Sequence, residues 1–324
     1  MGESNFRRIG RSGLAVSATG LGCNNLGRIH TATVTVDGSR AVVDAAIDAG
    51  ITFFDVADIY GAPAGRSEEI LGTVLGSRRK DVIVATKFGM DAGGANGPDF
   101  NARGSRRYVR AAVEASLRRL NTDWIDLYQL HQPDPQTPLD ETVAALDELV
   151  AAGLVRYIGH SNFSGWQVAD AAWVARSAGR VPFISAQNEY SLLNRSIERE
   201  LIPAAAAFGI GVLPFFPLAN GLLSGKYTRS DAPAGSRLRE QKPHLLDSAP
   251  WDALERLQES ADQRGVSMLQ VAVGWLLANP QVSSVIAGAT TPEQVAANAA
   301  AATAFVPTQD DLDEIDKIFP PPAE

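Results

Sequence analysis

The chain has 324 residues, of which 45% are hydrophobic and 20% are charged, and its formal net charge is −8 at pH 7. This length allows two average domains or one large barrel, and the composition supports a sizeable buried core instead of a disordered tail. Acidic residues are spread along the chain without a basic stripe, which argues against nucleic acid as a partner.

Targeting and cysteine signals are equally sparse. No apolar run reaches the roughly 18 residues that a bilayer-spanning helix needs, and the N-terminal stretch lacks the apolar core of a signal peptide. Cys23 is the single cysteine, so neither a disulfide framework nor a cysteine-based metal cluster is expected. We expect a cytoplasmic protein without membrane contact and without a bound metal.

Short apolar runs recur along the chain, and each is followed by a helical pattern. Runs that are apolar on both faces are typical of parallel strands covered by helices. The expected strands are Val16–Gly22, Ile51–Asp55, Val82–Lys87, Trp124–Leu130, Val155–Gly159, Phe183–Gln187, Gly211–Phe215 and Ser284–Ala287.

The intervening segments carry helix signals. Between Ser105 and Leu120 the apolar residues fall on one face. Thr137 before Pro138 predicts an N-cap with proline at the first helical position, and Gly153 predicts the end of that helix.

A second proline start follows near the end of the chain. Thr291, Pro292 and Gln294 have the spacing of a capping box. Trp251–Gly265 and Asp310–Phe319 are amphipathic stretches in addition to the alternation.

Strands that alternate with helices form right-handed βαβ units in a parallel sheet. Eight such units in about 300 residues fit a (β/α)8 TIM barrel, an α/β fold, with extra helices and long loops at its catalytic face. We expect residues 1–324 to form one barrel domain. The long loops are Phe88–Gly104 and the segment from Lys226 to about Pro250, each of which is either a lid or a disordered insertion.

Polar side chains gather where the expected strands end. In a barrel these ends face one cavity. The residues at these positions are Asp55, Lys87, His131, Ser161 with Asn162, Gln187 and Phe215, and Tyr60 follows Asp55 by five residues.

Three of these side chains suit proton transfer. A desolvated Lys87 needs a carboxylate such as Asp55 to stay protonated, and the resulting charge would lower the pKa of Tyr60 from about 10. Such a tyrosine can act as a general acid. His131 adds a neutral donor that can polarise a carbonyl. No second ligand at metal spacing accompanies His131.

Structural roles remain open for the same residues. Asp55 can cap its turn while Tyr60 packs over the barrel rim. Lys87 can be a surface lysine at a strand end, and His131 can satisfy hydrogen bonds in the core. Asp58 has no partner that the sequence identifies, so we expect it to be structural.

The combined motifs resemble the aldo-keto reductase superfamily, including its bacterial members and the branch of voltage-gated potassium channel β subunits. The resemblance rests on FFDVADIYG, VATKFG, LYQLHQPD and VIAGATTPEQVAAN, and it covers nearly the whole chain. It implies a catalytic tetrad of Asp55, Tyr60, Lys87 and His131.

The resemblance also implies a nicotinamide site. Ser161 and Asn162 in IGHSNF, with Gln187 in SAQNEYSLL, would hold the carboxamide. Phe215 stands where the family commonly has a stacking tyrosine, and it keeps the stacking face. The residues implied around the pyrophosphate are Leu218, Gly221 and Lys226, the last of which is alternatively a solvent-facing charge.

The adenosine end departs from the family pattern. Many relatives carry Lys or Arg here for the 2′-phosphate of NADP, whereas this chain has Thr and Gln in the last strand-to-helix turn. Arg237 would supply the missing charge, so NADP is preferred and NAD remains open. The candidate residues of this turn are Gly288, Thr290, Gln294 and Asn298.

A glycine pattern near the start, GLGCNNLG, is not a dinucleotide fingerprint, because its spacing is wrong. We expect Gly22 to let the first strand end approach the cofactor, with Asn24 beside it. Asn24, Asn25 and Leu26 then border the substrate pocket.

These observations predict an NADPH-dependent oxidoreductase that reduces an aldehyde or ketone, with Tyr60 as general acid. A cofactor-binding regulatory protein with little turnover, like the channel β subunits, is the alternative, and a Schiff-base lyase using Lys87 is a third. The sequence leaves open the physiological substrate, the oligomeric state and the conformation of both long loops.

Overall fold

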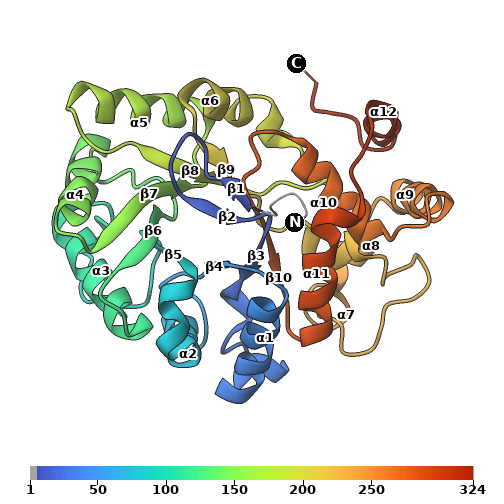
Figure 1. Cartoon of the computed structure of the whole chain (residues 1–324), viewed down its shortest axis with the longest axis horizontal. Helices are drawn as coiled ribbons and strands as arrows, with labels where there is room; N and C mark the ends of the chain where they lie inside the picture. The colour runs from blue at the N-terminus through green and yellow to red at the C-terminus, as the bar shows by residue number, and fades with distance from the viewer. Residues whose placement is uncertain (1–5, 324) are drawn as a thin grey trace.

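The computed structural model describes residues 6–323, and its centre is a (β/α)8 barrel (Figure 1). Eight parallel strands lie in the order β10-β3-β4-β5-β6-β7-β8-β9. Val212 and Ser283 close the ring, because Val212 N–H donates to Gln281 O and Ser283 N–H donates to Val212 O. The strands are β3 (Thr19–Gly22), β4 (Phe53–Asp55), β5 (Ile83–Phe88), β6 (Ile125–Leu130), β7 (Val155–Ser161), β8 (Phe183–Gln187), β9 (Gly211–Val212) and β10 (Val285–Gly288).

Helices surround this ring of strands, as Figure 1 shows. The helices of the described chain are α1 (Val36–Asp48), α2 (Arg66–Leu75), α3 (Arg106–Leu120), α4 (Leu139–Ala151), α5 (Gly165–Ser177), α6 (Leu201–Phe208), α7 (Arg237–Gln241), α8 (Pro243–Asp247), α9 (Trp251–Gln263), α10 (Met268–Ala278), α11 (Pro292–Ala304) and α12 (Gln309–Ile318). Short 3₁₀ helices are η1 (Cys23–Asn25), η2 (Ala32–Val34), η3 (Gly76–Asp81), η4 (Ser196–Glu198) and η5 (Ala219–Ser224).

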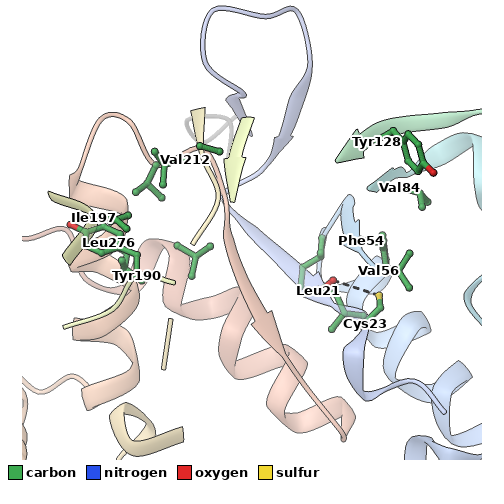
Figure 2. Packing of buried hydrophobic residues seen from close by; sticks show 14 of the residues in the cluster. Leu21, Cys23, Phe54, Val56, Val84, Tyr128, Tyr190, Ile197, Val212 and Leu276 are labelled. Carbon is green, nitrogen blue, oxygen red and sulfur yellow. Dashed lines mark hydrogen bonds between the residues drawn. The ribbon is translucent and has the colours of Figure 1, made fainter. Parts of the chain in front are cut away.

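Apolar side chains fill two separate cores. The larger lies between the strands and the helices, and Figure 2 shows part of it, with Leu21, Phe54 and Val56 around Cys23. The smaller lies inside the barrel, where Ile9 and Val16 meet inward-facing strand residues such as Phe53. Because strand side chains alternate between faces, outward residues build the first core and inward residues the second.

A hairpin contributes to the inner core. β1 (Phe6–Arg8) and β2 (Ala15–Ser17) pair antiparallel, with Phe6 opposite Ser17. The expected strand Val16–Gly22 is therefore two strands in the structure, and only Thr19–Gly22 joins the barrel. The sequence shows one continuous apolar run here because both halves are buried. Val16 belongs to the core inside the barrel, and Leu21 belongs to the core between strands and helices.

Several element boundaries differ from the sequence-based expectations. β9 ends at Val212, and Phe215 makes only an isolated bridge to Glu189. Pro138 is the N-cap of α4 instead of its first helical residue, while Thr137 Oγ1 donates to Asp134 Oδ2 at 2.7 Å.

Other helix boundaries were predicted well. Gly153 has φ +75° just after α4, as its place at the helix end predicted. Thr291 caps α11 by accepting from Gln294 N–H. The side chain of Gln294 does not complete a capping box, because its Oε1 accepts from Thr290 N–H at 2.8 Å.

Candidate active site

Lys87 lies at the centre of a buried polar cluster at the carboxyl ends of the strands. Its ammonium Nζ donates to Asp55 Oδ2 at 2.6 Å, to Val56 O at 3.0 Å and to Tyr60 OH at 3.3 Å. The Lys87 side chain is 0% exposed. Burial by itself would lower the pKa of Lys87, but Asp55 and then Tyr60 reverse the direction and raise it. Lys87 is therefore a protonated cation held by a carboxylate.

The carboxylate of Asp55 has further donors on its other oxygen. Gln187 Nε2 donates to Asp55 Oδ1 at 2.8 Å, and Gln129 Nε2 donates to the same atom at 3.4 Å. Ser185 Oγ in turn donates to Gln129 Oε1 at 3.2 Å. Both Asp55 oxygens are thus satisfied inside the barrel, which fixes the orientation of the carboxylate.

Tyr60 lies at the partly exposed edge of this cluster. Its ring packs edge-to-face against His131, with the ring centroids 6.0 Å apart. The expected lowering of the Tyr60 pKa is wrong for this structure. Burial raises the pKa of Tyr60, and this effect outweighs the lowering by Lys87. Tyr60 is accordingly a neutral phenol, which has a proton to donate.

His131 is buried and follows β6. Burial first, and the Lys87 charge second, hold the pKa of His131 well below 6.5. The imidazole is neutral at pH 7, as expected. Its Nδ1 has no hydrogen-bond partner within the described chain. The backbone N–H of His131 donates to Phe88 O at 2.7 Å, which places the backbone of His131 beside the end of β5.

The residues expected around a nicotinamide lie next to this cluster. Asn162 Nδ2 donates to His131 O at 2.9 Å and to Ser161 Oγ at 3.1 Å. Asn162 has φ +60°, a left-handed conformation that is uncommon for residues other than glycine. Gln187 donates one amide N–H to Asp55, it pairs with Ser161 across β7 and β8, and its backbone oxygen accepts from Asn162 N–H at 3.0 Å. Ser161, Asn162 and Gln187 are therefore close together.

Phe215 lies three residues after the end of β9, the strand that neighbours β8. Its backbone N–H donates to Asn188 O at 3.0 Å, and its ring contacts Phe216 edge-to-face with centroids 5.2 Å apart. Phe215 is only partly buried. Leu218 and Gly221 come next and are also partly buried, and Gly221 has φ +105°.

A group of cations lies beyond this loop. Lys226 is exposed over the Tyr227 ring. Arg237 is partly buried, and its Nε has no partner within the described residues. Burial and the neighbouring Arg28 lower the pKa of Arg237, and burial followed by Arg237 and Arg28 lowers that of Lys242. Arg28, Arg237 and Lys242 thus lie close enough to repel one another.

Neutral side chains accept hydrogen bonds from two of these cations, and Glu189 only partly opposes the lowering of the Lys242 pKa. Arg28 donates to Asn25 Oδ1 at 3.0 Å and also to Gln241 Oε1. Lys242 Nζ donates to Asn220 Oδ1 at 3.2 Å. All three acceptors are neutral amides. A group of cations held by neutral acceptors suits an anion.

Among the residues expected at the adenosine end, Gly288 lies beside the first strand end, where Gly22 and Asn24 were expected to approach the cofactor. Gly22 and Gly288 pair across β3 and β10, and a Cβ at Gly288 would lie 3.5 Å from Asn24 Oδ1, so Gly22, Asn24 and Gly288 are neighbours. Thr290 and Gln294 are joined by hydrogen bonds, which occupies Gln294 Oε1. Asn298 is buried on α11.

The sequence did not single out four polar residues of this region. Gln129 stands within an apolar run and faces the barrel interior because it lies two residues after Leu127. That alternation was a usable signal. Arg28 and Lys242 are far apart in the chain and Asn96 lies in a glycine-rich loop, so no local pattern predicts their contacts.

A parallel barrel whose strand ends deliver a carboxylate, a lysine, a tyrosine and a histidine to one place is the architecture of an enzyme. The Aldo/keto reductase family model matches residues 18–319. The chain belongs to the aldo-keto reductase family, and it is accordingly an oxidoreductase of the kind that acts on small carbonyl compounds.

Three relatives illustrate the range of the similarity. The chain is 34% identical to the L-glyceraldehyde 3-phosphate reductase of Escherichia coli (strain K12) over 328 residues, with 98% of this chain and 92% of that protein covered. It is 39% identical to the uncharacterized oxidoreductase YrpG of Bacillus subtilis, covering 90% and 88%. It is also 38% identical to a probable voltage-gated potassium channel subunit beta of Oryza sativa subsp. japonica, covering 90% and 89%.

None of the helices that the structure describes has the length and apolarity that crossing a membrane requires.

Proposed function

We propose that this chain is an NADPH-dependent carbonyl reductase in which Tyr60 is the general acid. The observation that carries the proposal is the position of Lys87 Nζ, which contacts Asp55, Val56 O and Tyr60 OH at once. A cation 3.3 Å from the phenol oxygen stabilises the phenolate that remains after the proton is given away.

The roles of the four residues follow from their contacts. Tyr60 donates its proton to the carbonyl oxygen, and Lys87 compensates the charge that this leaves. Asp55 keeps Lys87 protonated. The neutral His131 orients the carbonyl oxygen toward Tyr60 by hydrogen bonding.

The residues beside the cluster fit a nicotinamide dinucleotide, which supplies the hydride when bound. Ser161, Asn162 and the side-chain amide of Gln187 offer the donors and acceptors that a carboxamide needs. Phe215 offers a ring face for stacking. The left-handed Asn162 supports this assignment, because strained backbone persists mainly where function requires it.

NADP is preferred over NAD because of the cation cluster. Arg28, Arg237 and Lys242 repel one another, and Arg237 Nε is buried without a partner among the described residues. A bound phosphate group would offset the repulsion among the three cations and would accept a hydrogen bond from Arg237 Nε. Leu218, Gly221 and Lys226 would lie around the pyrophosphate, and Gly22 and Asn24 would lie where the first strand end approaches the cofactor. The residues that would border the adenosine end are Gly288, Thr290, Gln294 and Asn298.

The test of the reaction is oxidation of NADPH and of NADH with a panel of aldehydes and ketones. The panel should include a small phosphorylated aldehyde, because the Escherichia coli relative carries L-glyceraldehyde 3-phosphate in its name. We expect Tyr60→Phe to lower kcat by at least about 100-fold, the range of general acid catalysis. Its Kd for NADPH should stay unchanged, and full activity in this variant would refute the role of Tyr60.

The test of cofactor choice is Arg237→Met, which keeps the apolar stem and removes the charge. We expect the KM for NADPH to rise about tenfold, as the loss of one charged hydrogen bond implies, and the KM for NADH to change little. An equal rise for both would place Arg237 at the pyrophosphate and remove the support for NADP. Binding of NADPH without reduction of any carbonyl would favour the regulatory alternative.

A further inference from the structure

The turn after β4 wraps around Lys87 on one side. Asp55, Val56 and Tyr60 all receive hydrogen bonds from Lys87 Nζ. Asp58 takes part through its backbone, because its N–H donates to Lys87 O at 3.2 Å. The side chain of Asp58 makes no hydrogen bond to Lys87, and it is 0% exposed.

The carboxylate of Asp58 instead bonds to the long loop after β5. Asn96 Nδ2 donates to Asp58 Oδ2 at 2.6 Å and to Tyr108 OH at 3.2 Å. Asn96 is 6% exposed, although most of its neighbours between residues 91 and 100 are exposed. The Asn96 side chain therefore links the loop directly to the turn that carries Tyr60.

Asn96 is held in its turn by a buried ion pair. Arg119 Nη2 donates to Asn96 Oδ1 at 2.9 Å, and Arg119 Nε donates to Glu68 Oε2 at 2.7 Å. Thr86 Oγ1 completes the network by donating to Glu68 Oε1 at 2.5 Å. The network joins the β4 turn, α2, β5, the loop and α3 behind the candidate active site.

We propose that Asp58 and Asn96 are positioning residues that set the place of Tyr60 relative to the loop 88–104. The proposal rests on the proposed function of Tyr60. The turn is fixed from inside the barrel by Lys87 and from outside by Asn96. Losing the outer bond removes one of the two contacts that hold this turn, and a shift of Tyr60 OH of about 1 Å would cost as much as 100-fold in rate.

The charges around Asp58 favour an amide over a carboxylate at position 96. Glu68, Tyr108 and Tyr128 face it as acids, and Arg119 and Lys87 face it as cations. Burial first and Glu68 second raise the pKa of Asp58 to about 7, against the lowering by Asn96. A second carboxylate at position 96 would repel Asp58 above that pH, whereas an amide donates to it.

One partner of this contact is a carboxyl group and the other is an amide, so exchanging the two groups between positions 58 and 96 tests the contact. Asn96→Asp places two carboxyl groups together. The double variant Asp58→Asn with Asn96→Asp restores one amide and one carboxylate, and it leaves the carboxylate at position 96 facing Arg119. Asn101→Asp is the matched control, since it makes the same change on the same loop at an exposed site.

We expect Asn96→Asp to lower kcat/KM more than about tenfold at pH 8, in line with the loss of a buried charged hydrogen bond. The deficit relative to the unaltered protein should shrink at pH 6, where one of the two carboxyl groups is protonated. The double variant should return to within about threefold, and the control should match the unaltered protein.

Either of two results would overturn the proposal: a double variant no better than Asn96→Asp, or an Asn96→Asp enzyme with a lowered Tm and unchanged kinetics. Hydrogen exchange of the amides in residues 88–104, without substrate, supplies a readout independent of turnover. Faster exchange in Asn96→Asp, reversed in the double variant, supports the contact even if Tyr60→Phe shows that Tyr60 is not the acid.

Discussion

Within single strands, the interior of the barrel changes from apolar to polar over two positions. Phe53 and Asp55 lie on one face of β4, and Leu127 and Gln129 lie on one face of β6. The first residue of each pair packs in the inner core, and the second reaches the polar cluster. One alternating pattern therefore builds both the core and the candidate site.

Gly159 on β7 makes room for this polar layer. A Cβ there would overlap Ser185 Oγ and lie 3.1 Å from Gln129 Cγ. We predict that Gly159→Ala lowers the free energy of unfolding by about 2 kcal/mol, the usual cost of overpacking. Urea denaturation checks this. Adding Ser185→Ala should recover part of the loss, and Gly13→Ala, whose new Cβ has an ordinary contact of 3.5 Å, should be nearly neutral.

His160 is a buried histidine whose two ring nitrogens have no hydrogen-bond partner in the described residues. Its ring stacks on Phe163 at 4.3 Å, and burial lowers its pKa to about 3. Between pH 6.5 and 3 the unfolded chain binds a proton that the folded protein does not, so stability falls as the pH falls.

We therefore predict a smaller acid sensitivity for His160→Leu. The free energy of unfolding should fall between pH 7 and pH 5 by about 2 kcal/mol less than in the unaltered protein, at about 1.4 kcal/mol per pH unit. Urea titrations at both pH values measure this. His244→Leu, at an exposed position, should not reduce the fall, and equal behaviour of the two variants would contradict the prediction.

At the level of elements, the loop after β9 shows the strain expected near a ligand. Phe216, Ala219 and Asn220 have φ of 51°, 46° and 60°. Such conformations cost energy that other contacts must offset. The loop 226–250 beyond it is not a plain extended insertion, because α7 and α8 lie within it.

Ala219 offers a direct measure of that strain. We predict that Ala219→Gly raises the free energy of unfolding by about 0.5–1 kcal/mol, since glycine adopts positive φ without a steric cost. Ala206→Gly, an exposed position within α6, should lower it by about 1 kcal/mol. Thermal or urea unfolding distinguishes the two, and a loss of stability at both positions would show that Ala219 is not strained.

At the level of the whole molecule, the β1–β2 hairpin lies across the barrel and contributes Ile9, Leu14 and Val16 to its interior (Figure 1). The polar cluster lies at the opposite, carboxyl end of the strands. Stability and the proposed chemistry therefore occupy different ends of the same barrel, as is usual for this fold. The assignment of residues 1–324 to one domain remains a prediction.

Because the hairpin and the polar cluster lie at opposite ends of the barrel, a substitution in the hairpin should change the free energy of unfolding without changing cofactor binding. Ile9→Ala, at a position that is 0% exposed, should lower the free energy of unfolding by about 3 kcal/mol through the cavity it leaves. The Kd for NADPH should not change at a temperature where the variant is folded. Phe6→Ala, at a half-exposed position of the same hairpin, should cost much less, and weaker NADPH binding by Ile9→Ala would contradict the separation.

The sequence by itself was sufficient for the barrel and for most of the polar residues at its strand ends, though not for the short β9 before Phe215. Apolar runs of strand length and helix caps are local features, and the carboxyl ends of parallel strands must share one face, so Asp55, Lys87 and His131 were expected together. The proximity of these three residues follows from the strand order alone, without knowledge of any long-range side-chain contact.

Only the tertiary structure decided the rest. The raised pKa of Tyr60 depends on the balance between burial and Lys87, and the partner of Asp58 comes from Asn96, 38 residues away. The cation group unites Arg28 with Arg237 and Lys242 across the molecule. These are long-range contacts whose energies depend on distance and burial, and neither quantity is written in a local pattern of residues.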